Sequence, residues 1–262
     1  MSSSTGSAPG DHPAISTSPS TPSAAKEPPS PPPPPSPLDR AFLTGQPDVG
    51  ALILVRHGQQ EWPGGPNPAA SEWVDPPLSA IGQRQAEAVG ASLAHDRVDA
   101  VYSSHLRRAA ETGGQIAKHH GIDPVVYEEL REIEIFRDLP PGASIRDVVR
   151  PPFLRGMQER FIRERRWDVY PYTETSAEFR HRVLTSVEGI LAEHPAQRVV
   201  IACHGGVINA YVGYLLGLDE DMFFRPGHGS ISRVLVGDGR RVVHTLNEFH
   251  HLAAVDPALV TF

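Results

Sequence analysis

Strand-like and helix-like segments alternate along the chain from Ala51 onward, a pattern that only a few fold classes can accommodate. Short apolar runs predict strands at Ala51–Val55, Val98–Tyr102, Val125–Tyr127 and Arg198–Ala202. Apolar periodicity and helix-start signals predict helices from Ser79 to Leu93, from Leu106 to His120, from the capping box Thr175–Glu178 to Ile190, and from Val207 to Leu216. Strands alternating with helices predict an α/β fold, here three layers (α/β/α) around a mostly parallel central sheet.

Two parts of the chain depart from this alternation. Ile231–Val236 and Val242–Leu246 are expected to pair as a hairpin that turns at Gly237-Asp238-Gly239. The stretch over about 131–172 is rich in arginine, proline and aromatic residues, and we expect it to form a small cap insertion over the sheet edge. Residues 50–262 are therefore predicted to form one domain.

The first 49 residues have a different composition. Thirteen of the 27 prolines lie within the first 50 residues, including the run Pro31–Pro35, and serine, threonine, glycine and alanine separate them. Such a segment has too little apolar surface to offset the entropy of ordering, so residues 1–49 are predicted to be a disordered tail. A solvated leader is the favoured interpretation, and a protein partner of the SH3 type that binds the tail is the alternative.

Charge, hydropathy and cysteine content exclude several function classes. The net charge of -7 at pH 7 gives no basic footprint for nucleic acid. No apolar run reaches the roughly 18 residues of a membrane span, and no signal peptide is evident, so we expect a cytoplasmic protein that does not bind membranes. The single cysteine, Cys203, excludes an intrachain disulfide and a multi-cysteine metal site.

Residues that follow the predicted strands carry the chemistry, because ligands of open α/β sheets bind beyond the carboxyl ends of the strands. Arg56-His57-Gly58 follows the first strand, and Cys203-His204-Gly205-Gly206 follows the strand at Arg198–Ala202. The second of these motifs also opens a helix whose N-terminal amides favour anions, and Gly205 lets a ligand approach the backbone. Another strand leads through Ser103-Ser104 toward Arg108, which brings a second arginine to the same edge.

Two arginines, two histidines and a helix N-terminus at one sheet edge would bind a dianion. Guanidinium groups bind phosphate oxygens bidentately, and neutral imidazole is a competent nucleophile toward phosphorus. Phosphoryl transfer also needs a proton for the leaving oxygen, and Glu132, after the strand at Val125–Tyr127, is the candidate donor. Glu128, Glu129 and Glu134 lie beside it in the sequence, so a solvated acidic face is the alternative interpretation.

Four motifs occur in order, each near a predicted strand end: Leu54-Val-Arg-His-Gly-Gln59, Ser104-His-Leu-Arg-Arg-Ala109, Leu130-Arg-Glu-Ile133 and Ala202-Cys-His-Gly-Gly206. Together they resemble the successive motifs of the histidine phosphatase superfamily, the clan that contains cofactor-dependent phosphoglycerate mutase. Weaker matches at Asp75-Pro-Pro-Leu-Ser79, at Thr173-Glu-Thr175 ahead of Arg182, and at His251-Leu252 extend the resemblance over residues 51 to 252.

This resemblance implies a role for each matching residue. His57 would be the nucleophile that becomes phosphohistidine, Arg56 and Arg108 would clamp the phosphoryl oxygens, and His204 would complete the pocket. Glu132 would protonate the leaving group and then activate the water that hydrolyses the phosphoenzyme. Neither a metal nor a cofactor is implied, because the arginines would neutralise the charge. Arg107 matches a variable position and is expected to face outward.

The chain also departs from the family pattern around the leaving group. Gln60 stands where a small hydroxyl residue is usual, Pro63 stands where asparagine is usual, and Ile135–Pro141 replaces the usual segment after Glu132. The phosphoryl pocket is therefore expected to be intact, whereas the substrate pocket cannot be inferred by analogy. The substrate, expected to be a small phosphorylated metabolite, stays undefined.

The leading hypothesis is a metal-independent acid or neutral phosphatase, a phosphomonoesterase that works through phosphohistidine. The first alternative is a phosphoryl transferase of the phosphoglycerate mutase type, which needs a second basic anion site in the cap. The second alternative is a catalytically silent member that binds a phosphorylated ligand or a partner protein. The sequence leaves a homodimer open.

Overall fold

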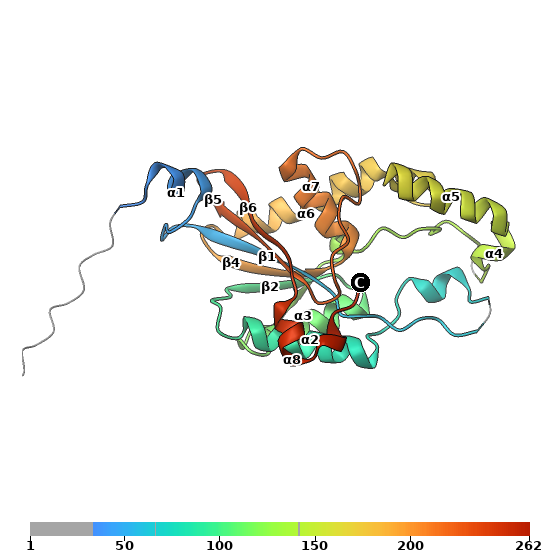
Figure 1. Cartoon of the computed structure of the whole chain (residues 1–262), viewed down its shortest axis with the longest axis horizontal. Coiled ribbons are helices and arrows are strands. Elements are labelled where there is room, and N and C mark those ends of the chain that lie inside the picture. The colour runs from blue at the N-terminus through green and yellow to red at the C-terminus, as the bar shows by residue number, and fades with distance from the viewer. Residues whose placement is uncertain (1–33, 66, 141) are drawn as a thin grey trace, which may run out of the picture. The chain divides into compact units, whose positions relative to one another are not determined.

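The computed structural model describes residues 34–65, 67–140 and 142–262 (Figure 1). Within this part of the chain, six strands form one sheet in the order β3-β2-β4-β1-β5-β6. The strands are β1 (Gly50–Arg56), β2 (Ala100–Ser103), β3 (Val125–Val126), β4 (Arg198–Cys203), β5 (Ile231–Gly237) and β6 (Arg240–Glu248). The α-helices are α1 (Pro37–Phe42), α2 (Ala80–Leu93), α3 (Arg107–Ala117), α4 (Ile145–Val148), α5 (Pro151–Glu164), α6 (Ser176–Glu193), α7 (Gly205–Leu216) and α8 (His250–Val255). Short 3-10 turns are η1 (Ala70–Trp73), η2 (Glu128–Leu130), η3 (Trp167–Val169) and η4 (Pro257–Leu259).

Helices cover both faces of the sheet, as the three-layer prediction requires. Figure 1 shows α6 and α7 on one face and α2, α3 and α8 on the other. Alternate side chains of β1 point to opposite faces: Leu52 and Leu54 join the apolar core under α6 and α7, whereas Ile53 and Val55 join the core under α2 and α3. The near-continuous apolar run of β1 follows from this burial on both faces.

Most of the sheet is parallel, which confirms the prediction. β1 pairs with β4, β4 with β2 and β2 with β3, all in parallel. β5 runs antiparallel to β1, and β6 returns antiparallel to β5 as the predicted hairpin. Asp238 and Gly239 at the turn both have positive φ, at 50° and 68°, which matches the twist of a two-residue hairpin turn.

The structured part of the chain begins earlier than the predicted boundary at residue 49. Ser36 caps α1 in a reciprocal capping box with Asp39, and Pro37 occupies the first helical turn, where its fixed φ favours helix. Leu43, after this helix, is only 1% exposed. The remaining part of the predicted tail, residues 1–33, lies outside the described residues.

The predicted cap insertion at 131–172 carries α4, α5 and η3 and has a small apolar cluster of its own. This cluster consists of Phe136, Leu139, Val149 and Met157. These four residues belong to neither of the two cores that flank the sheet. Ile133 and Trp167 of the insertion do belong to the core under α6 and α7, so the cap also packs against that core. Among the described residues, no helix is long and apolar enough to cross a membrane.

Candidate active site

The ends of β1 and β4 bring two of the predicted site residues together. These strands are parallel neighbours, with Arg56 paired in register with Cys203, and His57 N–H donates to the Cys203 carbonyl at 2.9 Å. The rings of His57 and His204, the residues that follow the two strands, have their centroids 5.1 Å apart. Both side chains are buried, at 4% and 0% exposure. The structure thus confirms that the two imidazoles meet at one sheet edge.

The hydrogen bonds of His57 fix which ring nitrogen is available for reaction. Nδ1 lies 2.6 Å from the Gly58 carbonyl oxygen, which can only accept, so Nδ1 carries the proton. Nε2 is therefore left with a lone pair, and Arg108 Nε donates to it at 3.3 Å. Burial and the neighbouring His204 and Arg108 hold the pKa of His57 well below its usual value of 6.5, so this imidazole stays neutral. A neutral, oriented Nε2 can act as a nucleophile.

Two guanidinium groups flank this nitrogen. Arg108, at the start of α3, is 5% exposed and also donates to the Val74 carbonyl at 2.9 Å. Arg56, at the end of β1, donates to the Pro226 carbonyl, while its buried Nε has no partner among the described residues. Because burial disfavours charge, the pKa of both arginines is lowered, that of Arg56 to about 10. Both groups stay charged at neutral pH, and their hydrogen-bond acceptors among the described residues are all neutral, so the site favours an anion.

Glu132 lies at the N-terminus of α7, next to the two arginines. Its carboxylate accepts hydrogen bonds from Gly206 N–H at 3.0 Å and from Ile133 N–H at 3.1 Å. A Cβ atom at Gly206 would come within 2.3 Å of Glu132 Oε1, so only glycine leaves room for the carboxyl group there. Desolvation outweighs these hydrogen bonds and raises the pKa of Glu132 above its usual 4.5. A carboxyl group that keeps its proton longer is suited to proton donation.

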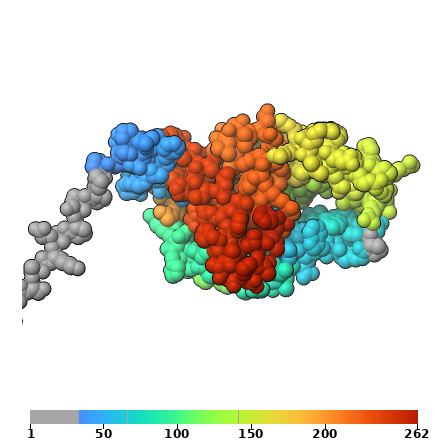
Figure 2. Space-filling model, in the orientation of Figure 1, coloured from blue at the N-terminus to red at the C-terminus, as the bar shows by residue number. Residues whose placement is uncertain are grey.

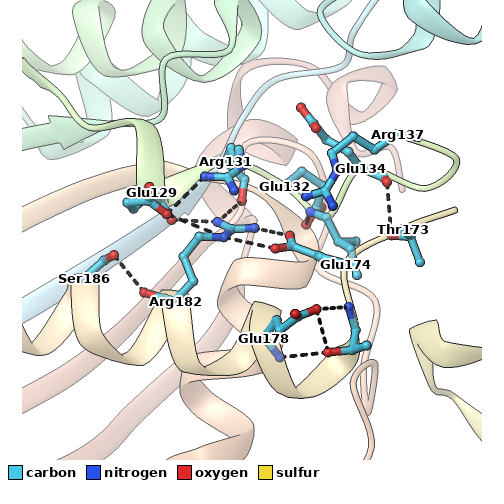
Figure 3. Close-up of polar contacts among 12 residues, drawn as sticks. Glu129, Arg131, Glu132, Glu134, Arg137, Thr173, Glu174, Glu178, Arg182 and Ser186 are labelled. Atoms are coloured by element: carbon cyan, nitrogen blue, oxygen red, sulfur yellow. Dashed lines mark hydrogen bonds and ion pairs between the residues drawn. The ribbon is translucent and has the colours of Figure 1, made fainter. Parts of the chain in front are cut away.

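A buried ion pair fixes the backbone that leads to Glu132 (Figure 3). Arg182 of α6 pairs with Glu174, and their side chains are 9% and 7% exposed. The guanidinium also donates to the carbonyls of Glu129 at 2.7 Å and Arg131 at 3.0 Å. Figure 3 shows Arg182 between this backbone and Glu174, so the pair holds the segment before Glu132 in place. The sequence match at 173–182 therefore has a structural reason.

Gly205, the remaining predicted site residue, also lies at this edge, whereas Arg107 points away from the site. Gly205 begins α7, and a Cβ atom added there would lie 3.7 Å from Arg56 Nε. Arg107, as predicted, faces outward: its side chain is 56% exposed and pairs with Asp75 at 3.4 Å. The motif residue Asp75 also accepts from Arg107 N–H, so it caps the start of α3.

The structure places a third histidine, His228, at the site, which the sequence analysis does not predict. Its ring centroid lies 5.9 Å from that of His57, its side chain is 8% exposed, and its Nδ1 contacts Thr261 Oγ1 at 3.0 Å. His228 precedes β5, which runs antiparallel to β1, so the start of β5 lies at the same edge as the end of β1. The sequence feature that could have indicated this position is the glycine on each side of His228, just before a predicted strand.

The pKa of His228 makes stability depend on pH. Burial and the charge of Arg56 lower this pKa from 6.5 to about 3. Above pH 6.5 the imidazole is neutral whether the chain is folded or unfolded; below it, only the unfolded chain takes up the proton. We therefore expect the free energy of unfolding to fall by about 2 kcal/mol, through His228 alone, when pH is lowered from 7 to 5.

Urea unfolding at the two pH values checks this expectation with His228→Asn. Between pH 7 and pH 5 the free energy of unfolding should fall by about 2 kcal/mol less in the variant than in the wild type, whatever the stability of the variant at pH 7. His244→Asn, an exposed position on β6, is the matched control and should follow the wild type. An unchanged pH dependence in His228→Asn would contradict the burial of a neutral imidazole.

A cavity of about 640 Å³ opens from the His57 and Glu132 side chains toward the cap. Its walls come from the segment around 60–74, from residues 132–136, and from α4, α5 and Tyr170. Figure 2 shows the surface hollowed between α5 and the segment around 60–75. The two sides meet at the far end, where Ala70 N–H donates to the Ala143 carbonyl at 3.0 Å. Gln60 and Pro63, the two departures from the family pattern, line this cavity.

Comparison with known proteins identifies relatives of the whole globular part. The family described as histidine phosphatase superfamily (branch 1) matches residues 52–248. Phosphoserine phosphatase 1 of Hydrogenobacter thermophilus is 31% identical over 77% of this chain and 93% of its own. A 2,3-bisphosphoglycerate-dependent phosphoglycerate mutase of Methylobacterium radiotolerans is 32% identical over 67% of this chain and 85% of its own. The solved structure of Bacillus stearothermophilus YhfR has the same fold, with a TM-score of 0.64 at 24% identity over 78% of this chain and 99% of that one.

Proposed function

Because the chain belongs to the histidine phosphatase superfamily, we propose that it hydrolyses a small phosphorylated metabolite through a phosphohistidine intermediate on His57. Phosphatase relatives support the general activity. The specific support comes from Nε2 of His57, a neutral nitrogen whose lone pair faces a buried guanidinium group 3.3 Å away. Two arginine charges that only neutral acceptors satisfy would be offset by one phosphate dianion.

The first step transfers the phosphoryl group to the enzyme. The lone pair of His57 Nε2 attacks phosphorus, and the bond between phosphorus and the leaving oxygen breaks. Glu132 donates its proton to that oxygen, so the product leaves as a neutral alcohol. The Gly58 carbonyl, which accepts from Nδ1 at 2.6 Å, stabilises the positive charge that develops on the imidazole. Arg56, Arg108 and the N-terminal amides of α7 hold the phosphoryl oxygens.

The second step regenerates the enzyme with water. Glu132, now ionised, takes a proton from a water molecule whose oxygen attacks phosphorus. The bond between phosphorus and Nε2 breaks, its electron pair returns to the imidazole, and inorganic phosphate leaves. The protonated Glu132 is then ready for another cycle. Neither step needs a metal or a cofactor, because the two guanidinium groups supply the positive charge that a metal ion would supply.

A mutase must hold a bisphosphorylated intermediate and therefore needs a second anion site. Among the described residues, Arg146, an exposed side chain, is the one cation on the cavity wall beyond the two phosphoryl clamps. Glu134 on the same wall would repel a second phosphate. These features favour the phosphatase over the mutase.

The product distinguishes the phosphatase from its alternatives. The purified protein is incubated with 3-phosphoglycerate and a trace of 2,3-bisphosphoglycerate, and in parallel with p-nitrophenyl phosphate. We expect inorganic phosphate from p-nitrophenyl phosphate and no 2-phosphoglycerate. Formation of the isomer would favour the mutase. Equal, slow phosphate release by wild type and His57→Ala would favour a silent member that only binds phosphorylated ligands.

A further inference from the structure

The cavity beyond the phosphoryl site has mostly apolar walls. Five apolar or aromatic side chains line it and at the same time pack against the small core of the cap: Ala70, Ile135, Ile145, Leu154 and Tyr170. All five are only partly buried, so one side of each is packed and the other faces the cavity. Trp73 adds aromatic surface to the same wall, and the buried Phe136 supports it. A ligand that covers such exposed apolar surface removes it from water, which makes the free energy of binding more favourable.

Packing holds this wall in a definite shape. Phe136 has φ of 66°, a left-handed conformation that is unfavourable for a bulky residue. Its ring is 5% exposed and contacts Tyr170 edge-on, with centroids 5.8 Å apart. Strained backbone persists only where surrounding packing determines it, and such positions cluster at binding sites. The cap core therefore holds the wall residues in place before any ligand binds.

The wall begins at the proton donor itself. The four residues that follow Glu132 along the chain all line the cavity: Ile133, Glu134, Ile135 and Phe136. A substrate whose phosphoryl group lies at His57 and whose leaving oxygen lies at Glu132 must extend its alcohol along these side chains. A volume of about 640 Å³ lies in the range of about 300–1,000 Å³ that accommodates drug-sized ligands.

We propose that the substrate is the phosphate monoester of a bulky, mainly apolar alcohol, rather than of a small charged one such as serine or glyceric acid. This inference rests on the proposed phosphatase function and adds its substrate class. The charged side chains of the wall beyond the phosphoryl site, among the described residues, are Glu134 and the exposed Arg146. The substrate's apolar body would instead cover the side chains that face the cavity from the cap core.

Three esters of primary alcohols test the proposal: ethyl phosphate, O-phospho-L-serine and 3-phenylpropyl phosphate. Their unactivated leaving groups make chemistry comparable, so differences in kcat/KM report the alcohol pocket. Burying one large apolar group of the substrate should raise kcat/KM about tenfold or more. We expect kcat/KM for 3-phenylpropyl phosphate to exceed that for the other two by at least about tenfold. Equal values, or a preference for phosphoserine, would overturn the proposal.

Two neighbouring residues of α5 give a matched pair of variants. Leu154 lines the cavity, whereas Phe153 is 65% exposed and does not. Leu154→Ser should reduce the preference for 3-phenylpropyl phosphate over ethyl phosphate about tenfold, and Phe153→Ser should keep it. Thermal unfolding at pH 7 would show that both variants are folded. If Leu154→Ser keeps the full preference, the apolar wall does not bind the alcohol.

The same data separate this proposal from the proposed function. Hydrolysis of ethyl phosphate that disappears in His57→Ala supports the phosphatase, whichever alcohol is preferred. An active enzyme without preference for the bulky ester retains the proposed function and refutes the substrate class. If no ester is hydrolysed, binding of propyl and 3-phenylpropyl phosphonate by calorimetry decides: tighter binding of the phenyl compound supports the apolar pocket, and equal binding refutes it.

Discussion

Replacing His57 by asparagine is expected to lower kcat for phosphate release on the order of 10⁴-fold or more. Asparagine fills part of the same space and can still bond the backbone, but its amide nitrogen has no lone pair to offer to phosphorus. The reaction would then depend on direct attack by water, without the intermediate. Initial rates with p-nitrophenyl phosphate, followed as released phosphate, measure the loss.

The control for this variant is the same substitution at an exposed histidine. His244→Asn on β6 lies far along the hairpin and should keep the wild-type rate. Thermal unfolding of His57→Asn at pH 7 would show that the variant is folded. A rate above about 1% of wild type in a folded His57→Asn protein would remove His57 from the nucleophile position.

Replacing Glu132 by glutamine is expected to separate two kinds of substrate. kcat/KM for ethyl phosphate should fall on the order of 10²- to 10³-fold, because an alkoxide cannot leave without a proton. kcat/KM for p-nitrophenyl phosphate should change by less than about tenfold, because nitrophenolate leaves unprotonated. The ratio kcat/KM covers only the steps up to release of the alcohol, so slower hydrolysis of the phosphoenzyme does not obscure the comparison.

The same variant should change the pH profile for ethyl phosphate. Wild-type activity requires protonated Glu132, whose pKa is raised by burial, so kcat/KM should fall as pH rises through that pKa. Lowered pKa values keep His57 and His204 neutral well below pH 6.5, so no loss from protonation of these histidines is expected near pH 6.5. In Glu132→Gln the decline at higher pH should disappear.

Glu128→Gln is the matched control for the acidic cluster around Glu132. Glu128 lies in η2, four residues earlier, and is exposed. Its substitution should leave kcat/KM for both esters and the pH profile unchanged. If Glu132→Gln lost equal activity on ethyl and p-nitrophenyl phosphate, Glu132 would not be the proton donor, and the acidic cluster would be a solvated face.

The residues at the sheet edge could be predicted because short, local sequence patterns identify both the strands and the residues that follow them. Apolar runs buried on both faces mark parallel strands, and the residues just after them must meet at one edge, so the sequence alone predicts that His57 and His204 lie together. Their rings lie 5.1 Å apart. The rule does not identify His228, because it considers only the ends of parallel strands, whereas β5 is antiparallel and starts at the same edge.

The contacts that shape the cap, and the start of the structured chain before residue 49, could not be predicted in the same way. The cap depends on contacts between distant segments: Ala69 pairs with Ser144, and Asn67 bonds Asp147 at 3.3 Å. No periodic pattern within 131–172 encodes those contacts. By composition Pro37 belongs to the proline-rich tail, but proline is favourable in the first turn of a helix, and Ser36 before it caps α1.

Trapping the covalent intermediate tests the central claim most directly. Wild type and Glu132→Gln are mixed with ³²P-labelled p-nitrophenyl phosphate and quenched within milliseconds in alkali, which preserves phosphohistidine and hydrolyses phosphoserine. Peptide mapping then locates the label. We expect it on His57, with more of it in Glu132→Gln, where the water is activated poorly. Label on any other residue, or turnover without label on His57, would contradict the mechanism.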